Sequence, residues 1–195
     1  MSAIAGIVLA AGGGRRFGGP KAVAEIDGER LVDRACRLLR EGGCAPVVAV
    51  LGAAVVPVPG ADDVVVNPEW ADGMGSSLRA GLAAGTLTAA PDVVAAVLVL
   101  ADQPWLSASA VRAVARGATT SSLVMATYPS EDGQHGAERG HPVVLGRDHW
   151  AGVRELARGD VGARPYLRAH AADVVVVPVE GSAADVDRPE DLPST

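Results

Sequence analysis

The chain has 195 residues, of which 49% are hydrophobic and only 3% aromatic, and its formal net charge at pH 7 is −6. This length gives room for one domain with a sizeable core, and the apolar content excludes global disorder. Nonspecific nucleic-acid binding requires a basic face and often stacking aromatic residues, so the composition excludes that class too.

The two cysteines, Cys36 and Cys44, have a spacing that suggests neither a disulfide framework nor a zinc site. We expect buried thiols in a reducing compartment. The first residues lack the basic segment of a signal peptide, and no run of about 18 apolar residues exists to span a membrane. The sequence therefore predicts a cytoplasmic protein.

The first predicted element is a strand over residues 4–11, which is uncharged and aliphatic apart from Gly6. A continuous apolar run of this kind is typical of a strand covered on both faces. The strand breaks into three glycines at 12–14, and then come Arg15–Arg16 and Lys21. Glycine lets the backbone approach a ligand closely, and successive exposed N–H groups form an anion site. The loop therefore suits a triphosphate.

Two well-known phosphate motifs do not fit this loop. The Walker pattern requires a lysine where Pro20 stands. The dinucleotide pattern Gly-x-Gly-x-x-Gly misses its third glycine, and Asp33 is a poor candidate for the acidic residue expected about twenty positions on. The alternative to a phosphate site is a structural glycine-rich turn with solvated basic residues.

Beyond this loop, strands and helices alternate. After a connector at 22–30, an apolar face at i, i+4, i+7 and i+8 predicts a helix from Leu31 that ends before Gly42-Gly43. Further strands are predicted at 47–51, 64–66, 93–100, 123–127, 141–145 and 174–179, and further helices at about 76–85, 107–116, 147–157 and 162–170. Ser76 or Ser77 is expected to cap one helix and Ser107 the next. This alternation predicts parallel crossover units.

A polar loop and a final turn complete the chain. Residues 129–140 form a loop long enough to be functional. Pro142 argues that the following strand starts there or lies at an edge, and Pro189 is expected to begin a last helical turn. We see no repeat or linker. Residues 1–195 are therefore predicted to form a single three-layer α/β/α Rossmann-like domain with a mostly parallel sheet.

Three stretches lie at predicted carboxyl ends of strands, where open α/β sheets bind ligands. They are the glycine loop, the segment with Ser76 and Ser77, and Asp102. Asp102 follows an aliphatic strand, and a carboxylate in this place suits magnesium, which favours one or two carboxylates plus phosphates and water. The alternative is a helix-capping or turn aspartate.

The glycine loop resembles the signature of MobA-like nucleotidyltransferases, Leu-Ala-Ala-Gly-x-Ser-x-Arg-Met-Gly-x-x-Lys. The matching positions are Leu9, Ala10, Ala11, Gly12, Arg16, Gly18 and Lys21. Gly14 replaces the serine, and Phe17 replaces the methionine. Further segments that resemble the family, in order along the chain, are 67–82, 102–104, 140–143, 159–164 and 185–192.

The resemblance implies a nucleotide-diphospho-sugar-transferase-like fold and magnesium-dependent transfer of a nucleoside monophosphate to a phosphorylated acceptor such as molybdopterin, with release of pyrophosphate. It implies catalytic roles for Arg16, Lys21 and Asp102, and Mg²⁺ binding by Asp102 and Asp187. The implied nucleotide-binding residues are Leu9, Ala10, Ala11, Gly12, Gly13, Gly14, Arg16, Lys21, Gly75, Ser76 and Ser77. The implied acceptor-binding residues are Gly140, His141, Pro142 and Arg164.

The residue at position 11 indicates which nucleobase the nucleotide donor carries. Guanylyl-transferring relatives have Leu-Ala-Gly-Gly, with a glycine where this chain has Ala11. A well-packed site tolerates little added volume, so the extra methyl favours the smaller cytosine over guanine. The segments 140–142 and 162–164 are most typical of the molybdopterin cytidylyltransferase branch. We therefore expect CTP as the donor.

Two functions of other classes stay open. The first is an oxidoreductase with NAD(P)H or flavin in the same cleft, against which the poor dinucleotide pattern argues. The second is a non-catalytic partner that delivers cofactor to a molybdenum enzyme, against which the joint presence of Lys21, Asp102 and Asp187 argues. We expect Trp70 to pack rather than to hold a base. The alternative role for His141 is to finish a strand.

Overall fold

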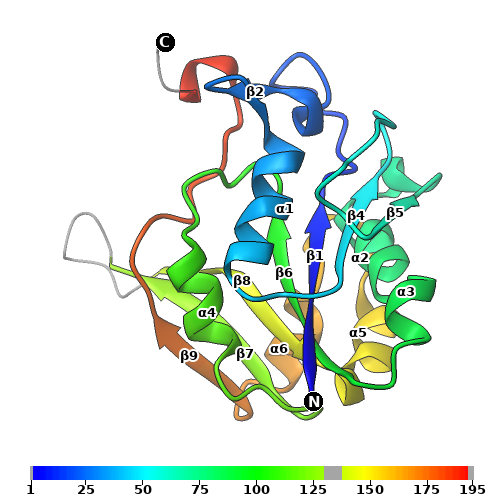
Figure 1. Cartoon of the computed structure of the whole chain (residues 1–195), viewed down its shortest axis with the longest axis vertical. Coiled ribbons are helices and arrows are strands. Elements are labelled where there is room, and N and C mark those ends of the chain that lie inside the picture. Colours follow the sequence, from blue (N-terminus) through cyan, green and yellow to red (C-terminus); the bar gives the residue numbers. More distant parts are fainter. Residues whose placement is uncertain (1, 130–137, 193–195) are drawn as a thin grey trace.

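A computed structural model describes residues 2–129 and 138–192, with helices on both faces of one large sheet (Figure 1). Most of the predicted 129–140 loop therefore lies outside the described residues. The strands are β1 (Ala3–Leu9), β4 (Val47–Leu51), β5 (Asp63–Val66), β6 (Val93–Leu100), β7 (Leu123–Tyr128), β8 (Glu138–Gly146) and β9 (Val174–Pro178). Their order in the sheet is β5-β4-β1-β6-β8-β7-β9, and every pairing is parallel except those of β8. This confirms the predicted mostly parallel sheet.

The helices form the outer layers. One face carries α1 (Leu31–Glu41) and α4 (Ala108–Ala115). The other carries α2 (Met74–Leu82), α3 (Gly85–Thr88), α5 (Trp150–Leu156) and α6 (Arg164–Ala169). Single turns of 3₁₀ helix are η1 (Lys21–Val23), η2 (Trp70–Asp72), η3 (Arg147–His149), η4 (Gly159–Val161) and η5 (Pro189–Asp191). The three-layer α/β/α prediction is confirmed.

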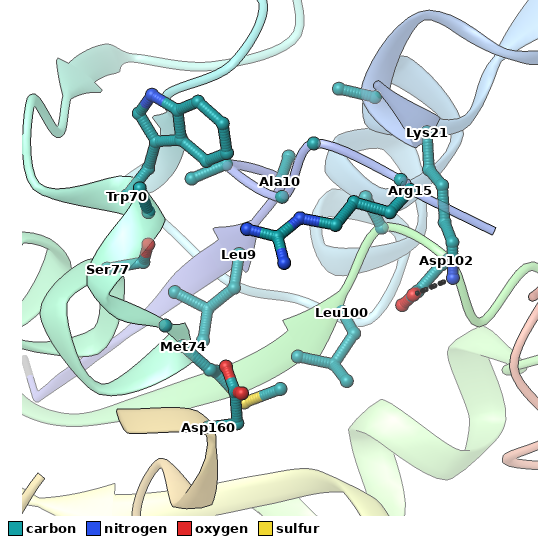
Figure 2. Close-up of a pocket in the computed structure, with 18 of the residues that line it drawn as sticks. Leu9, Ala10, Arg15, Lys21, Trp70, Met74, Ser77, Leu100, Asp102 and Asp160 are labelled. Atoms are coloured by element: carbon teal, nitrogen blue, oxygen red, sulfur yellow. Dashed lines mark hydrogen bonds and ion pairs between the residues drawn. The ribbon is translucent and has the colours of Figure 1, made fainter. Parts of the chain in front are cut away.

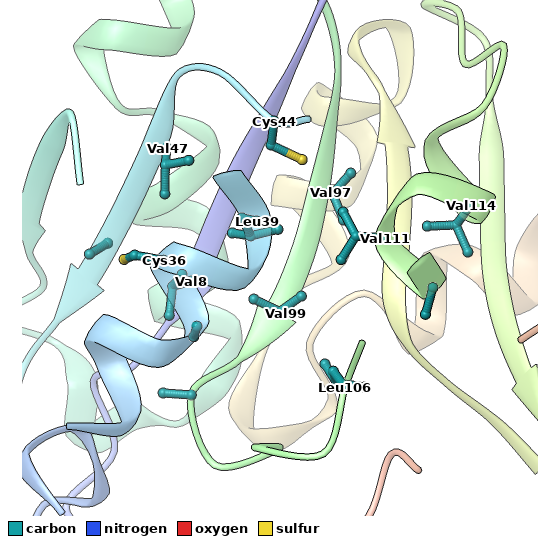
Figure 3. Close-up of a cluster of buried hydrophobic side chains, with 14 of the residues drawn as sticks. Val8, Cys36, Leu39, Cys44, Val47, Val97, Val99, Leu106, Val111 and Val114 are labelled. Carbon is teal, nitrogen blue, oxygen red and sulfur yellow. The ribbon is translucent and has the colours of Figure 1, made fainter. Parts of the chain in front are cut away.

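Aliphatic side chains hold these layers together. Under α1 and α4, Leu39 packs with valines of β1 and β6 such as Val8 and Val97 (Figure 3). Gly6 makes this contact close, because a Cβ there would lie 2.7 Å from Cδ1 of Leu39. On the other face a Cβ at Gly81 would lie 2.9 Å from Ile7, so α2 also packs close to β1. The middle of β1 is thereby held between α1 and α2.

Three local expectations need correction. Helix α2 begins at Met74 with Gly73 as its N-cap at φ +101°, so neither Ser76 nor Ser77 caps it. Pro142 lies in an internal strand, yet the pairing of β8 with β7 passes from Met125↔Val143 to Ala126↔Gly140. The proline therefore sits in a bulge, where its missing N–H removes no ladder bond. The connector at 22–30 contains a hairpin of β2 (Glu25–Ile26) and β3 (Glu29–Arg30).

Other details agree with the sequence. Ser107 caps α4, since its side chain accepts a hydrogen bond from the N–H of Ala110 at 3.1 Å. Cys36 and Cys44 are buried free thiols, and burial raises the pKa of each to about 12. Within residues 2–129 and 138–192, none of the helices has the length and apolar character that crossing a membrane requires.

Candidate functional site

A pocket of about 440 Å³ opens where β1 and β6 end (Figure 2). Its walls come from the glycine loop, from the start of α2, from the segment after β6 and from the C-terminal part of the chain. Among its lining residues are Leu9 to Arg16, Lys21, Trp70, Met74, Ser77, Leu100, Asp102, Asp160 and Asp187. Segments distant in sequence thus meet at the sheet end that the strand pattern indicated.

The glycine loop offers hydrogen-bond donors to this pocket. Among the described residues, the backbone N–H groups of residues 11–14 have no acceptor. The carbonyl of Gly14 accepts hydrogen bonds from the N–H groups of Gly18 and Gly19, at 2.9 and 3.3 Å, which closes the following turn. Gly14 has φ +58°, and a Cβ there would collide with the carbonyl oxygen of Gly19. The loop therefore requires glycine at 14 and leaves a row of donors free for an anion.

A chain of ion pairs crosses the mouth of the pocket. Nζ of Lys21 lies 2.9 Å from Oδ2 of Asp102 and 3.0 Å from Oδ1 of Asp187. Nη1 of Arg16 lies 2.8 Å from Oδ2 of Asp187. Burial lowers the pKa of Lys21, but the hydrogen bonds and charges of Asp102 and Asp187 outweigh it, so the pKa is raised overall. Hydrogen bonding to Lys21 lowers the pKa of Asp187, so Lys21 and Asp187 are both charged at neutral pH.

The two carboxylates fit a divalent cation. Asp102 and Asp187 already converge on a single cationic atom, the Nζ of Lys21, so one ion can contact both. The described residues contain no group of three or more His, Cys, Asp or Glu side chains placed to hold a metal, here or elsewhere, so an ion at this pair would take its other ligands from outside the protein. Two carboxylates with the remaining positions open to phosphate and water is the arrangement that Mg²⁺ favours.

The two arginines of the loop differ in position. Arg16, the residue that matches the family signature, is 74% exposed and lies at the rim with Asp187. The side chain of Arg15 extends across the pocket instead, towards the side of Trp70 and Met74 (Figure 2). In the part of the chain that the structure describes, Arg15 forms no ion pair. Sequence reasoning missed Arg15, although the doubled arginine was the available signal.

Residues of the α2 segment divide between the pocket and its support. Ser77 lines the pocket, whereas Gly75 and Ser76 do not. A Cβ at Gly75 would lie 2.7 Å from the backbone nitrogen of Arg158, so this glycine serves close packing. Trp70, which was expected only to pack, lines the pocket as well. Asp160 also lines it, although sequence reasoning assigned no role to this residue of the 159–164 segment.

None of the four predicted acceptor residues, Gly140, His141, Pro142 and Arg164, is among the residues that line the pocket. Val143 pairs with Leu98, which brings His141 near the end of β6. Burial, and after it the charge of Arg164, lowers the pKa of His141 to about 4, so the imidazole is neutral at pH 7. Gly140 faces Ala183, at 2.9 Å from the position of an added Cβ. The structure thus brings His141 and Arg164 together.

Comparison with known proteins links this pocket to a family. Residues 6–174 match the family model described as the MobA-like NTP transferase domain. The chain is 35% identical to "Nicotine blue oxidoreductase" of Paenarthrobacter nicotinovorans over 98% of this chain and 96% of that protein. It is 42% identical to "Probable molybdenum cofactor guanylyltransferase" of Opitutus terrae, but over only 43% of this chain and 44% of that protein.

Solved structures share the fold over nearly the whole chain. Rv0371c from Mycobacterium tuberculosis H37Rv has a TM-score of 0.78 and 27% identity, covering 97% of this chain and 95% of that chain. A complex of Rv0371c with manganese has a TM-score of 0.74 and 25% identity, covering 97% and 96%.

Proposed function

The chain belongs to the MobA-like NTP transferase family, and from this membership we propose that it transfers CMP from CTP to a phosphorylated acceptor such as molybdopterin. In the proposed reaction an acceptor phosphate oxygen forms a bond to the α-phosphorus. The bond between the α-phosphorus and the bridging oxygen breaks, and pyrophosphate leaves.

One observation carries the proposal. Donors, cations and carboxylates meet at one pocket. They are the N–H groups of residues 11–14, which have no acceptor among the described residues, the cations of Lys21, Arg15 and Arg16, and the convergent pair of carboxylates. A triphosphate requires donors and cations, and two carboxylates beside them suit the divalent ion that accompanies it. The manganese complex of the similar Rv0371c supports a divalent ion here.

The chain's own residues act by positioning and by neutralising charge. The N–H groups of the glycine loop orient the phosphates, and Lys21 with Arg16 neutralises charge that develops on the departing pyrophosphate. Asp102 and Asp187 would hold Mg²⁺, which when bound supplies further neutralisation of phosphate charge. The neutral His141 and the Arg164 cation, beside Gly140 and Pro142, are proposed to hold the acceptor.

The proposal also specifies the nucleobase, since we expect CTP and not GTP as the donor. Ala11 lines the pocket but is almost fully buried, and its methyl faces Gly52 below Trp70. Its effect on the base therefore acts through the backbone that these contacts hold in place. A methyl in direct contact with a substrate discriminates by about 1–3 kcal/mol, so for this indirect effect we expect a preference for CTP of tens of fold at most.

Competition binding of CTP and GTP with Mg²⁺ tests the base, and pyrophosphate release with molybdopterin tests the reaction. Equal affinities, or tighter GTP as the description of the Opitutus terrae relative would suggest, overturn the cytidylyl assignment and leave nucleotidyl transfer intact. Failure of every nucleoside triphosphate to release pyrophosphate with any phosphorylated acceptor overturns transfer itself.

An oxidoreductase is the second candidate, because the full-length relative at 35% identity carries that description. In that case NAD(P)H or flavin would occupy the same pocket. An absorbance scan of the purified protein and an assay of NADPH oxidation separate the two. We expect no bound chromophore and no oxidation. Steady NADPH consumption without pyrophosphate release would reverse the order of the candidates.

Three expectations from the sequence belong to the same proposal. Residues 1–195 act as one domain, the reaction takes place in the cytoplasm, and a molybdenum enzyme is the partner that receives the product. The buried free thiols of Cys36 and Cys44 agree with a reducing compartment.

A further inference from the structure

The segment that follows β9 brings Asp187 to the pocket. From the end of β9 the chain continues to the end of β6, where Asp102 stands (Figure 1). Within this C-terminal segment, residues 179–191, Val186 is fully buried, and its N–H donates to the carbonyl of Asp102 at 2.8 Å. One backbone hydrogen bond thus joins the residue before Asp187 to the other carboxylate residue of the proposed Mg²⁺ site.

Gln103 supplies a second attachment, three residues earlier in the same segment. This side chain follows Asp102 and is part of a residue that is 7% exposed, and its Nε2 donates to the carbonyl of Ala183 at 2.8 Å. Ala183 also packs on Gly140 of β8, where an added Cβ would lie 2.9 Å from the Cβ of Ala183. A segment attached at one residue can pivot there, but attachments at 183 and 186 fix its direction, and with it the position of Asp187.

The contact with Ala183 leaves Gln103 with an unpaired atom. Because a carbonyl can only accept, the amide nitrogen of Gln103 must face Ala183, and the orientation of the amide is fixed. The other amide atom, Oε1, is buried and has no hydrogen-bond partner among the described residues. A buried acceptor without a partner destabilises the folded state. Gln103 therefore serves the attachment of the C-terminal segment at a cost to the stability of the fold.

The ion pairs of Asp187 cannot replace this attachment. Lys21 and Arg16 contact the carboxylate of Asp187 itself, at 3.0 and 2.8 Å. A divalent cation in the proposed site would take the place of Lys21, so the contact with Lys21 is given up when the ion binds. The hydrogen bonds of Gln103 and Val186 involve the backbone of the segment instead, and they do not compete with the ion.

We infer that Gln103 is a positioning residue for the metal site, because it holds the C-terminal segment so that the carboxylate of Asp187 converges with that of Asp102. The inference rests on the proposed function, since it concerns the divalent ion that accompanies the triphosphate. It makes a distinctive prediction: loss of the Gln103 amide weakens metal binding without weakening the fold. A residue with only a structural role would lower the stability and leave the metal affinity of the folded protein unchanged.

Gln103→Met is the test variant, since methionine is unbranched and has no group that could donate to Ala183. The melting temperature of the metal-free protein should equal or slightly exceed that of the wild type. The unpaired Oε1 is gone, and Ala183 is only half-buried, so water can reach its carbonyl. Titration with Mn²⁺ alone, followed by the electron paramagnetic resonance signal of the free ion, should show about tenfold weaker binding. This corresponds to about 1.4 kcal/mol, which one hydrogen bond can supply.

Amide hydrogen exchange measures the attachment without any metal. The N–H of Val186 should exchange faster in Gln103→Met than in the wild type, because the segment that carries it opens more often. The N–H of Ala101, which donates to the carbonyl of Leu9 at 3.1 Å, reports on the neighbouring strands and should exchange at an unchanged rate.

Ser107→Ala is the matched control. Ser107 lies four residues after Gln103, and its hydroxyl lies 3.4 Å from the carbonyl of Glu180 in the same C-terminal segment. It also caps α4 by accepting a hydrogen bond from the N–H of Ala110. We expect a lower melting temperature, because a helix cap is lost, and an unchanged affinity for Mn²⁺.

The outcomes separate the inference from the proposed function. If the wild type binds Mn²⁺ and Gln103→Met binds it equally well, or if the exchange of Val186 is unchanged, the role of Gln103 is wrong and the transferase proposal stands. A Gln103→Met protein that melts well below the wild type, or does not fold, also overturns the inference, because Gln103 would then support the fold. If the wild type binds no Mn²⁺ with or without CTP, the divalent-ion site and the inference fall together.

Discussion

Replacing Lys21 with methionine should strengthen the binding of a divalent cation to the protein without nucleotide. The Lys21 ammonium now occupies the place between Asp102 and Asp187 where such an ion would bind. A metal arriving alone must displace it. A metal arriving with a triphosphate meets less opposition, because the phosphates offer Lys21 and Arg16 new partners. The structure therefore predicts that metal and nucleotide bind with positive coupling, and that Lys21→Met removes much of it.

The magnitude follows from the pair of Lys21 and Asp102. At 2.9 Å their Coulomb attraction is about 6 kcal/mol for an effective dielectric constant of 20 and about 1.4 kcal/mol for water. The side chains are 14% and 26% exposed, and the cost of their partial burial offsets most of the larger value. We therefore use the lower figure, which corresponds to a tenfold gain in metal affinity for Lys21→Met.

Titration with Mn²⁺, followed by the electron paramagnetic resonance signal of the free ion, measures this affinity with and without CTP. Arg15→Met is the matched control, because it removes one positive charge from the same pocket but no partner of the carboxylates. Its metal affinity without nucleotide should stay within about twofold of the wild type. The reasoning is refuted if Lys21→Met binds Mn²⁺ no more tightly than the wild type, or if Arg15→Met gains as much.

Three further substitutions test other parts of the site. Gly14→Ser restores the serine of the family signature, yet φ +58° and the carbonyl of Gly19 leave no room for a side chain, so thermal melting should show lower stability and titration weaker CTP binding; wild-type values would contradict the loop geometry. His141→Gln should remove a pH dependence of the free energy of unfolding. The folded pKa is about 4, below the unfolded value near 6.5, so the unfolded state takes up the proton first and stability falls as pH drops from 6.5 to 4. Urea unfolding at pH 7 and pH 4.5 should show the wild type losing roughly 2 kcal/mol more than the variant, and equal losses would count against a buried neutral imidazole. Asp102→Asn should slow pyrophosphate release on the order of a thousandfold with little change in melting temperature, and near-normal rates would remove Asp102 from catalysis.

Local sequence patterns were sufficient for most of the sheet. Aliphatic runs identified the strands at 47–51 and 93–100 with their observed bounds, because strands buried on both faces leave no polar residue to blur the pattern. The start of α2 was misplaced because polar residues inside the helix resemble a capping signal. Ser76 and Ser77 have the chemistry of caps, but Gly73 takes the capping position, since its φ of +101° is one that serine rarely adopts.

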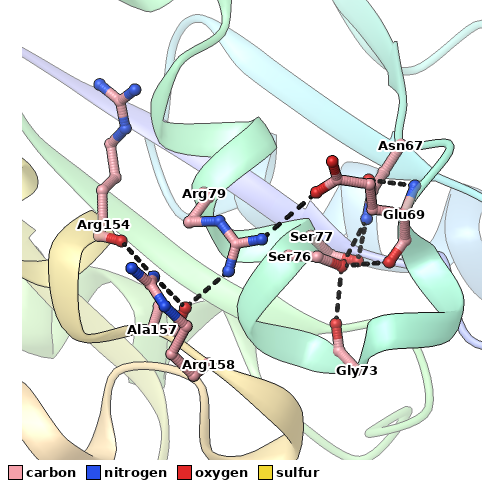
Figure 4. A network of polar contacts seen from close by, with 9 residues as sticks. All are labelled: Asn67, Glu69, Gly73, Ser76, Ser77, Arg79, Arg154, Ala157 and Arg158. Atoms are coloured by element: carbon pink, nitrogen blue, oxygen red, sulfur yellow. Dashed lines mark hydrogen bonds and ion pairs between the residues drawn. The ribbon is translucent and has the colours of Figure 1, made fainter.

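The site was harder to predict because its contacts are tertiary. Family matching identified Lys21, Asp102 and Asp187, but nothing local shows that one ammonium contacts both carboxylates. The roles of the arginines were likewise hidden, because adjacent residues have the same side chain. Only the backbone path sends Arg15 across the pocket and leaves Arg16 exposed beside Asp187. Asn67 carried no catalytic signature, and its hydrogen bonds to Ser76 and Ser77 appear only in the structure (Figure 4).

The ion-pair chain also distinguishes the two candidate functions. In nucleotidyl transfer the carboxylates of Asp102 and Asp187 must exchange Lys21 for a divalent ion when the triphosphate arrives, so the affinities for metal and nucleotide are necessarily coupled. An oxidoreductase that holds a dinucleotide has no need of that ion, and Lys21 would stay between the carboxylates throughout its cycle. Each function thus assigns a different fate to the same 2.9 Å contact between Lys21 and Asp102. Coupling between Mn²⁺ and CTP that is present in the wild type and absent in Lys21→Met therefore supports transfer over the full-length similarity to an oxidoreductase.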